Sequence, residues 1–254
     1  MTTSVLAQSG RPQRRTIAGY FIMPVVLLAA LGLLWFYVDT RTLDSIEARS
    51  LNLSRLVSAT IEHVGLTAVS TSLTLAIAVP LGIIFTREWT RSFRSYLITL
   101  LTLGQAIPTI AILVLLAVAF SFLGFAAAIT GLVLYAIVPV LLNTMVGIEE
   151  VDDAVLEAGK GMGMSKWGVL TKLELPLAIP VMLAGVRTAL VINVGTATLV
   201  TYINAGGLGD IIVAGLSTNR FTVQIVGAAL TAVLALTIDY LAGIAETFLR
   251  PRGL

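Results

Sequence analysis

The 254-residue sequence contains no cysteine and a single histidine, His63. Without cysteine the chain cannot form disulfides or thiolate metal sites, and one histidine leaves the common zinc-binding spacings without ligands. We therefore expect no metal site and no redox chemistry. Charge is also scarce, since Asp, Glu, Lys and Arg make up only 12% of the residues. The basic residues are spread between apolar segments and form no continuous stripe, so we do not expect nucleic acid as a partner.

What the sequence has instead is apolar residues, at 57% of the chain, and a mean hydropathy of +0.97. These values are typical of an integral membrane protein, because about 20 apolar residues are needed for one helix to cross a bilayer. Six such stretches predict an all-α, polytopic fold with six transmembrane helices: 17–38, 64–85, two within 95–148 that separate near 121–125, 177–203 and 221–249.

The first stretch resembles a signal peptide in following Arg11, Arg14 and Arg15. Its apolar run is longer than that of a signal peptide, however, and it ends in aromatic residues rather than a small-residue cleavage site. We expect it to be kept as an extra N-terminal transmembrane anchor, 17–38, followed by an extracytoplasmic segment, 39–63.

The Lys and Arg residues between the stretches predict the orientation. Loops of one set carry eleven of them (Arg11, Arg14, Arg15, Arg87, Arg91, Arg94, Lys160, Lys166, Lys172, Arg250, Arg252), and the opposite loops carry four (Arg41, Arg49, Arg55, Arg220). Cytoplasmic loops are enriched in Lys and Arg. Both termini, 1–16 and 250–254, and the loop 149–176 are therefore expected in the cytoplasm.

This cytoplasmic loop contains a glycine-rich and lysine-bearing stretch, "EAGKGMGMSKWGVLTKLELP", at 157–176. It lacks the spacing of a nucleotide-binding glycine motif, and no strand leads into it. A structural interpretation fits better: Asp152 or Asp153 caps one short helix, Gly161 or Gly163 ends it, and Ser165 caps a second. Pro176 then lies in the first turn of the next transmembrane helix.

This elbow has more apolar side chains than a solvated loop needs, namely Val155, Leu156, Met162, Met164 and Trp167. Exposed apolar surface of this kind indicates a protein partner. The alternative is an elbow that only joins two transmembrane helices.

The same stretch resembles the EAA motif of ABC importer permeases, which reads EAA, three residues, G, nine residues, I, any residue, LP. The matching residues are Glu157, Ala158, Gly159, Gly163, Leu173, Leu175 and Pro176. Gly159 stands in place of the second Ala and Leu173 in place of Ile, and Gly159 is expected to loosen the first helix slightly.

The resemblance implies a permease domain at 64–249 whose elbow is the coupling helix that binds a separate ATPase subunit. ATP and Mg²⁺ would then be held by that partner, and this chain would bind no cofactor and have no catalytic residue. The resemblance also implies an extracytoplasmic substrate-binding protein, a second permease copy or paralogue, and a bacterial inner membrane.

Longer segments are similar to permeases for osmoprotectants such as glycine betaine, choline and carnitine. They are "GQAIPTIAIL" at 104–113, the segment 138–167, "AGVRTALV" at 184–191 and "INAGGLGDIIVAGL" at 203–216. "AGGLGD" alone is weaker evidence, since methionine importer permeases are similar there, and a methionine or other amino-acid importer is the alternative.

Little in this chain suits recognition of a quaternary ammonium, which favours an aromatic cage, because only 7% of residues are aromatic. We expect selection to lie in the binding protein. The loop 204–220, with Gly206, Gly207, Gly209 and Asp210, is the expected docking site for it. His63 is interpreted as a residue of the membrane interface rather than a ligand.

Polar residues at helical spacing are the candidates for lining a translocation path. They are Thr71 and Thr74 on the second span, Gln105 and Thr109 on the third, and Asn193 and Thr196 on the fifth. The alternative is that they form hydrogen bonds between helices of the same chain.

Two charges interrupt the last two spans. Arg187 lies eleven residues after Pro176 and Asp239 eleven before Arg250, so both should be roughly 16 Å from the cytoplasmic face. An ion pair between them is predicted, more as a structural link than as a substrate site.

Other classes fit less well. A membrane-embedded enzyme needs a cluster of His, Asp, Glu or Cys that the spans lack, and a secondary transporter often shows an internal repeat that is not visible here. A channel is a remote third possibility.

Overall fold

The computed structural model describes residues 17–249, and within this range the chain is built of helices without strands. The helices are α1 (Ile17–Asp39), α2 (Ser45–Ser50), α3 (Leu53–Phe85), α4 (Arg91–Gly104), α5 (Thr109–Phe120), α6 (Phe125–Glu149), α7 (Asp153–Gly161), α8 (Lys166–Val169), α9 (Leu175–Thr196), α10 (Leu208–Thr218) and α11 (Phe221–Leu249). Glu88–Thr90 and Leu199–Ile203 form 3-10 turns, and Leu170–Glu174 forms a π-helical segment. The predicted terminal segments 1–16 and 250–254, with their basic residues, lie outside the described range.

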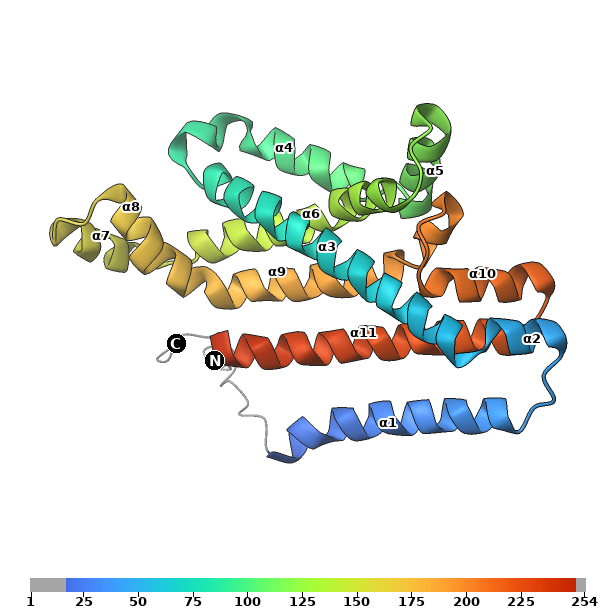
Figure 1. The fold of residues 1–254 in the computed structure, drawn as a ribbon. Helices are drawn as coiled ribbons and strands as arrows, with labels where there is room; N and C mark the ends of the chain where they lie inside the picture. Colours follow the sequence, from blue (N-terminus) through green and yellow to red (C-terminus); the bar gives the residue numbers. More distant parts are fainter. Residues whose placement is uncertain (1–16, 250–254) are drawn as a thin grey trace, which may run out of the picture.

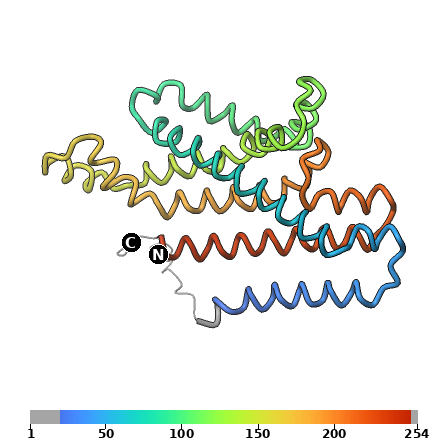
Figure 2. Tube along the Cα trace, viewed as in Figure 1, coloured from blue at the N-terminus to red at the C-terminus, as the bar shows by residue number. Residues whose placement is uncertain are grey.

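The long helices run side by side and give the molecule two ends (Figure 1). One end carries the elbow of α7 and α8 and the turn from α3 to α4, and the opposite end carries α2 and α10, as the chain trace also shows (Figure 2). Helix α3 packs on α6 and α9, α6 packs on α9, and α11 packs on α9 and α10. Helix α1 contacts α11, so the anchor joins the bundle from outside its centre.

Five helices of the described range are long and apolar enough to cross a membrane: α1, α3, α6, α9 together with α8 and the π-helical segment, and α11. The sixth candidate is the pair α4 and α5, which is bent by 87°. The bend corrects the expectation of one continuous third helix. Pro108 has no N–H to donate and disfavours helix in the residue before it, which explains why the helix stops at Gly104 and restarts at Thr109.

The helix boundaries differ elsewhere as well. The predicted separation near 121–125 is confirmed, because Ser121 is left-handed at the end of α5 and α6 begins at Phe125. Helix α3 begins at Leu53, eleven residues before the expected Val64, because the Asn52 side chain accepts a hydrogen bond from the N–H of Arg55 and caps it. The expected docking loop is itself helical over α10.

The centre of the bundle is packed through small residues of α3, α6 and α9. A Cβ added at Gly82 on α3 would lie 2.7 Å from the Cβ of Thr144 on α6. A Cβ at Gly185 on α9 would lie 2.9 Å from the carbonyl oxygen of Pro139 on α6. Small residues let helix backbones approach closely in membranes, where packing drives helix association. These three helices therefore form the close-packed core between the end that carries the elbow and the end that carries α2 and α10.

Candidate functional site

The first helix of the elbow, α7, is defined by its two caps. The Asp152 carboxylate accepts a hydrogen bond from the N–H of Ala154 at 2.8 Å and caps its start. Its end is a left-handed turn at Gly163, with φ +82°, where the N–H of Met164 donates to the carbonyl of Gly159. Of the glycines considered from the sequence, Gly163 therefore ends the helix, and Gly161 lies within it.

The second helix, α8, leads directly into the membrane. Ser165 accepts a hydrogen bond from the N–H of Gly168 at 3.1 Å and caps its start. The chain then continues through the π-helical segment Leu170–Glu174 into α9, where Pro176 lies in the first turn. Pro176 cannot donate to the carbonyl of Lys172, and its ring crowds that carbonyl, which favours a wider turn at this point.

The two positions at which the elbow departs from the EAA motif lie against each other. Gly159 is buried, and a Cβ added to it would lie 2.5 Å from Cδ1 of Leu173. The Leu173 side chain thus occupies the space that an alanine at 159 would need. An alanine at 159 would therefore require the Leu173 side chain to move, whereas glycine leaves room for that side chain as it lies.

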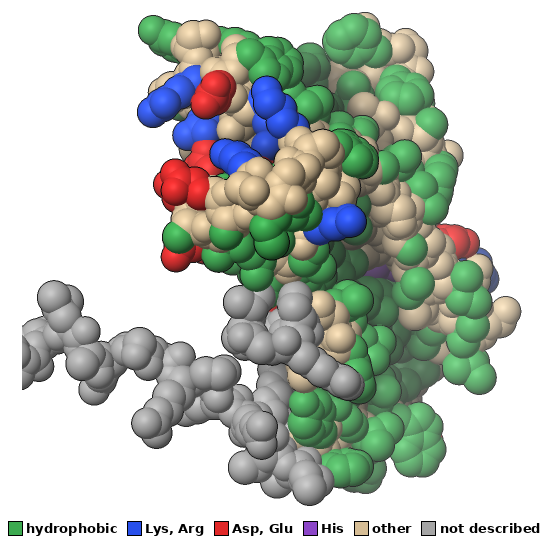
Figure 3. Space-filling view, turned by 90° about the vertical axis from the view of Figure 1, so that its left-hand side faces the viewer, with side chains coloured by type: hydrophobic (Ala, Val, Ile, Leu, Met, Phe, Trp, Pro, Cys, Tyr) green, Lys and Arg blue, Asp and Glu red, His purple; other side chains and the backbone are tan. Residues whose placement is uncertain are grey.

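The exposed surface of the elbow carries both polar and large apolar side chains. Glu157 and Ala158 are exposed, and so are the large apolar side chains of Val155 (39%), Met162 (76%) and Trp167 (72%). Figure 3 looks onto the end of the molecule that carries the elbow, and most of the charged side chains visible there gather at its upper left. Large exposed apolar side chains such as those of Met162 and Trp167 are typical of a surface that binds a protein partner.

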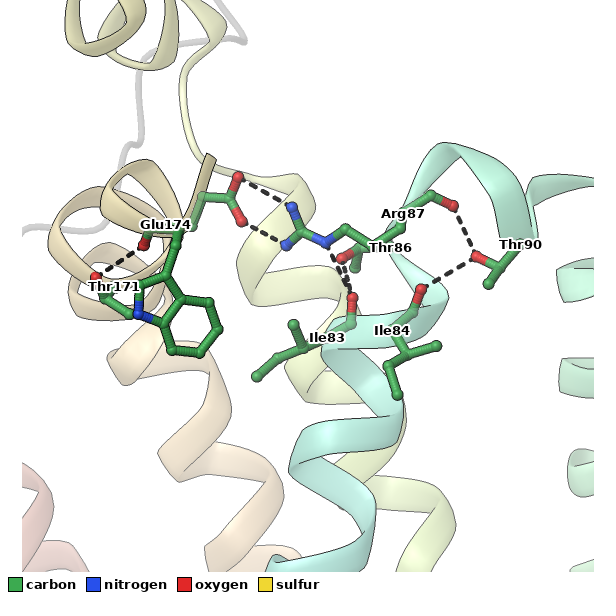
Figure 4. A network of polar contacts seen from close by, with 8 residues as sticks. Ile83, Ile84, Thr86, Arg87, Thr90, Thr171 and Glu174 are labelled. Carbon is green, nitrogen blue, oxygen red and sulfur yellow. Dashed lines mark hydrogen bonds and ion pairs between the residues drawn. The ribbon is translucent and has the colours of Figure 1, made fainter. Parts of the chain in front are cut away.

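An ion pair joins the elbow to α3. Nη2 of Arg87, just beyond the end of α3, lies 2.5 Å from Oε2 of Glu174, and Nη1 lies 3.3 Å from Oε1. Figure 4 shows the guanidinium pointing at the carboxylate while its Nε donates to the carbonyl of Ile83. Only 10% of the Glu174 side chain is exposed. A second pair at this end, Arg94 with Glu149, joins α4 to α6 and is more exposed.

Arg187 on α9 and Asp239 on α11 form a two-point ion pair. Nε of Arg187 lies 2.5 Å from Oδ1 of Asp239, and Nη2 lies 2.6 Å from Oδ2. Two parallel hydrogen bonds between a guanidinium and a carboxylate fix both distance and angle. The pair thus links the core helix α9 to α11 within the membrane-spanning part of the chain.

The candidate path residues are mostly enclosed by this one chain. Thr71, Thr74, Thr109 and Asn193 are buried, whereas Gln105 and Thr196 are half-buried. The Asn193 amide donates to the Thr71 hydroxyl at 3.0 Å, and the Gln105 amide donates to the carbonyl of Tyr135 at 3.3 Å. These two hydrogen bonds agree with the alternative, in which the polar side chains join helices of the same chain. The path assignment stays a prediction, and it requires these helices to separate before a solute can reach the buried groups.

At the opposite end, the expected docking residues are built into the fold. Gly206 and Gly207 have φ of +81° and +92°, and the N–H of Gly207 donates to the Glu62 carboxylate at 3.1 Å. Gly209 is buried, and a Cβ there would collide with the backbone of Thr198. Asp210 accepts a hydrogen bond from the Thr201 hydroxyl. Their docking role is untested, since the arrangement describes only how this turn is held.

His63 is fully buried within the chain, so its side chain does not face the membrane interface as the sequence suggested. Its Nδ1 lies 3.2 Å from the N–H of Leu208, and its Nε2 lies 2.9 Å from the carbonyl of Val194. The first contact needs an acceptor and the second a donor, which together assign a neutral ring with the proton on Nε2. The histidine therefore links α3 to α9 and α10.

Residues 17–249 contain no group of three or more His, Cys, Asp or Glu side chains that could hold a metal ion.

Residues 78–252 match the family model described as "Binding-protein-dependent transport system inner membrane component". The chain belongs to this family. It is the permease subunit of a binding-protein-dependent ABC importer, a transport component that crosses the membrane. Membership implies an ATPase subunit and a substrate-binding protein as partners.

Curated relatives of this permease cover most of its length. It is 44% identical over 176 residues, or 69% of this chain and 78% of the relative, to the carnitine transport permease protein OpuCD of Listeria monocytogenes. It is 36% identical to the glycine betaine/carnitine/choline transport system permease protein OpuCB of Bacillus subtilis, over 80% of this chain and 92% of the relative. The osmoprotectant import permease protein OsmW of Salmonella typhimurium is 33% identical, over 84% of this chain and 100% of the relative.

Solved structures share the fold of this permease. A chain of the MetNI methionine ABC transporter in an inward-facing conformation superposes with a TM-score of 0.65 at 23% identity, covering 77% of this chain and 96% of that chain. A chain of an amino acid ABC transporter with histidines gives a TM-score of 0.66 at 19% identity, covering 82% and 100%. At these identities the similarity concerns the fold alone.

The permease also contains polar contacts that the sequence did not indicate. Arg87 was counted only as a positive charge and Glu174 only as the variable position of the motif. Their pairing depends on the π-helical turn and on the end of α3, which lie 87 positions apart in the sequence. Glu62 and His63 are adjacent in the sequence, but their partners, the N–H groups of Gly207 and Leu208, lie 145 positions away.

Proposed function

We propose that this permease imports osmoprotectants, and that its substrates are quaternary amines such as glycine betaine, choline and carnitine. The observation that carries the proposal is the 44% identity to a carnitine transport permease, together with 36% identity to a permease named for glycine betaine, carnitine and choline. A fold shared with a methionine transporter does not favour methionine at 23% identity.

In this proposal an ATPase subunit binds the elbow. The exposed side chains of Val155, Met162 and Trp167 would supply the apolar contact, and Glu157 with Ala158 would lie at its edge. ATP and Mg²⁺ would be held entirely by that subunit. The elbow has the local stiffness that force transmission needs, because both of its short helices are capped by side chains.

The substrate-binding protein would dock at the opposite end of the molecule. The buried glycines at 206–209 suit a supporting role there, and the exposed side chains of Tyr202 and Leu216 are better placed to touch a docked protein. The loaded binding protein would dock outside, ATP would close the ATPase pair inside, and the elbow would convert that closure into opening of the outer side.

The permease would work as two copies, or with a paralogue, in a bacterial inner membrane with both termini in the cytoplasm. In the described part of one chain, Thr71, Thr74 and Asn193 are buried against other helices of the same chain. A path between two permease subunits would let these helices separate during transport.

The test is reconstitution of the permease in nanodiscs with its ATPase subunit and binding protein. We expect glycine betaine, choline or carnitine to stimulate ATP hydrolysis only when the binding protein is present. Stimulation by methionine and by none of the quaternary amines would overturn the substrate assignment. A matched control omits the permease, because hydrolysis by the free ATPase subunit should not respond to the solute.

A further inference from the structure

The elbow is continuous in the chain with α6 and α9, but its connection to α3 runs through side chains. Arg87 and Glu174 make that connection with two hydrogen bonds between charged groups (Figure 4). Glu174 is the last residue of the π-helical segment, and Arg87 follows the last turn of α3 by two residues. The pair therefore joins the base of the elbow to the end of the longest helix of the described range.

The guanidinium is held on both sides. Besides its two contacts with the carboxylate, its Nε donates to the Ile83 carbonyl at 3.2 Å, which fixes the side chain on the last turn of α3. The end of α3 is itself closed by Thr90, whose hydroxyl contacts the carbonyls of Ile84 and Arg87. A planar guanidinium with such contacts has little freedom to rotate, so movement of Glu174 must displace α3 or break the pair.

Helix α3 then extends to the other end of the molecule, with polar contacts to the elbow and to the far end of α9. Glu174 contacts Arg87 at the elbow, and at the last turn of α9 Asn193 contacts Thr71 and the carbonyl of Val194 contacts His63. Beside His63, Glu62 binds the glycine turn at Gly207. A displacement delivered to α3 at Arg87 thus reaches the turn that supports the outer face.

We propose that Arg87 and Glu174 are positioning residues for energy coupling, through which movement of the elbow is transmitted to α3. This inference rests on the proposed function, in which an ATPase subunit acts on the elbow. Packing contacts between apolar side chains can slide, whereas a two-point ion pair keeps one distance and one orientation. Loss of the pair should therefore leave hydrolysis in place while transport falls.

The test uses the complete complex of permease, ATPase subunit and binding protein in proteoliposomes, with radiolabelled glycine betaine outside and ATP inside. The variants are Glu174→Gln, which keeps the shape and removes the charge, and the exchange Arg87→Glu with Glu174→Arg. Glu149→Gln is the matched control, because it removes another ion pair at the same end that joins α4 to α6 instead. Uptake and ATP hydrolysis are measured on the same vesicles.

We expect Glu174→Gln to assemble and hydrolyse ATP while the amount of betaine imported per ATP falls about tenfold, the factor that corresponds to one charge-assisted hydrogen bond. The exchange should recover most of this ratio, and Glu149→Gln should leave it unchanged. The inference is overturned if Glu174→Gln imports as much betaine per ATP as a wild-type complex that is active in transport. It is also overturned if Glu174→Gln and Glu149→Gln lower this ratio alike.

Equal loss of hydrolysis and uptake in Glu174→Gln, with the complex intact, also overturns the inference, because it indicates a structural link only. If the wild-type complex shows no uptake or stimulation with any quaternary amine, the proposed substrate has failed instead. The solute that does stimulate the wild type then replaces betaine in the same comparison.

Discussion

Arg187 and Asp239 place opposite charges on neighbouring helices within the membrane-spanning part, where an ion pair limits the cost of burying them. Replacing Arg187 by Ala removes the guanidinium from a carboxylate whose placement at a helix centre costs about 2.5 to 3.5 kcal/mol on insertion scales. We expect lower amounts of folded permease in the membrane and weaker packing of α11 on α9. The measurement is the amount of permease that remains monodisperse after extraction in mild detergent.

The exchange of both residues, Arg187→Asp with Asp239→Arg, supplies the control. It restores opposite charges, so it should recover part of the lost permease, whereas Asp239→Ala alone should resemble Arg187→Ala. If the double exchange yields as little monodisperse permease as either single variant, the contact contributes by geometry rather than by charge.

His63 fills a different role, since it satisfies two backbone groups at once. Replacement by Leu leaves the N–H of Leu208 and the carbonyl of Val194 without this partner in a fully buried position. Each buried polar group left without a partner costs about 1 to 3 kcal/mol. We expect a clearly lower thermal unfolding temperature of the purified permease. Glu62→Gln, at an exposed position, should change it much less, and equal unfolding temperatures for wild type and His63→Leu would contradict the assignment.

Single residues show how far sequence reasoning reaches. The contact between Arg187 and Asp239 was anticipated because helix rise converts sequence distance from a membrane boundary into depth. No such rule exists for Arg87 and Glu174, or for His63 and Leu208, since their meeting depends on where helices end and how they cross. His63 was assigned to the interface from its position near a span end, whereas α3 begins ten residues before it and the ring is buried in contact with α9 and α10.

At the scale of elements, hydropathy located the apolar helices well. The helix α11 matches the expected 221–249, and α1 extends only one residue beyond 17–38. The helices α2 and α10 were missed because they are short and lie where a connecting segment was expected. The 87° bend between α4 and α5 was also missed, although Pro108 lies at it. A proline in the sequence does not by itself predict a bend, because α3, α6 and α9 each continue through a proline. In membrane proteins, neighbouring helices, polar side chains and ordered waters can satisfy the backbone groups that such a proline frees.

The elbow provides a prediction at this scale. Gly159→Ala places a Cβ 2.5 Å from Cδ1 of Leu173, so either the Leu173 side chain or α7 must shift to make room. We expect weaker binding of the ATPase subunit, measured as the amount that copurifies with the permease. Adding Leu173→Ile to Gly159→Ala restores the residues of the EAA motif at both positions and should recover binding.

The control is Leu173→Ile alone, which completes the set of two single variants and one double variant. It should leave a gap beside Gly159 and cost less than Gly159→Ala, because a shape change of equal volume usually costs under about 1.5 kcal/mol. Additive effects of the two substitutions would show that the residues do not depend on each other.

At the scale of the whole molecule, the proposed orientation in the membrane rests on the distribution of charge, and the absence of cysteine makes it measurable. Met162 on the elbow and Ser217 on α10 are both exposed and lie at opposite ends of the bundle (Figure 1). In intact cells or spheroplasts, a membrane-impermeant maleimide should label Ser217→Cys and should label Met162→Cys only after the membrane is opened. The unsubstituted chain gives the background, and the reverse pattern would contradict the predicted orientation.

The same reagent tests the partner surface of the elbow. If the ATPase subunit covers Met162, which is 76% exposed in the isolated chain, then adding that subunit to opened membranes should slow labelling of Met162→Cys. Labelling of Ser217→Cys should keep its rate, because that residue lies at the other end. Equal slowing of both would indicate a general effect of the added protein. Unchanged labelling of Met162→Cys, in membranes where the subunit demonstrably binds, would move the interface away from the apolar side chains of the elbow.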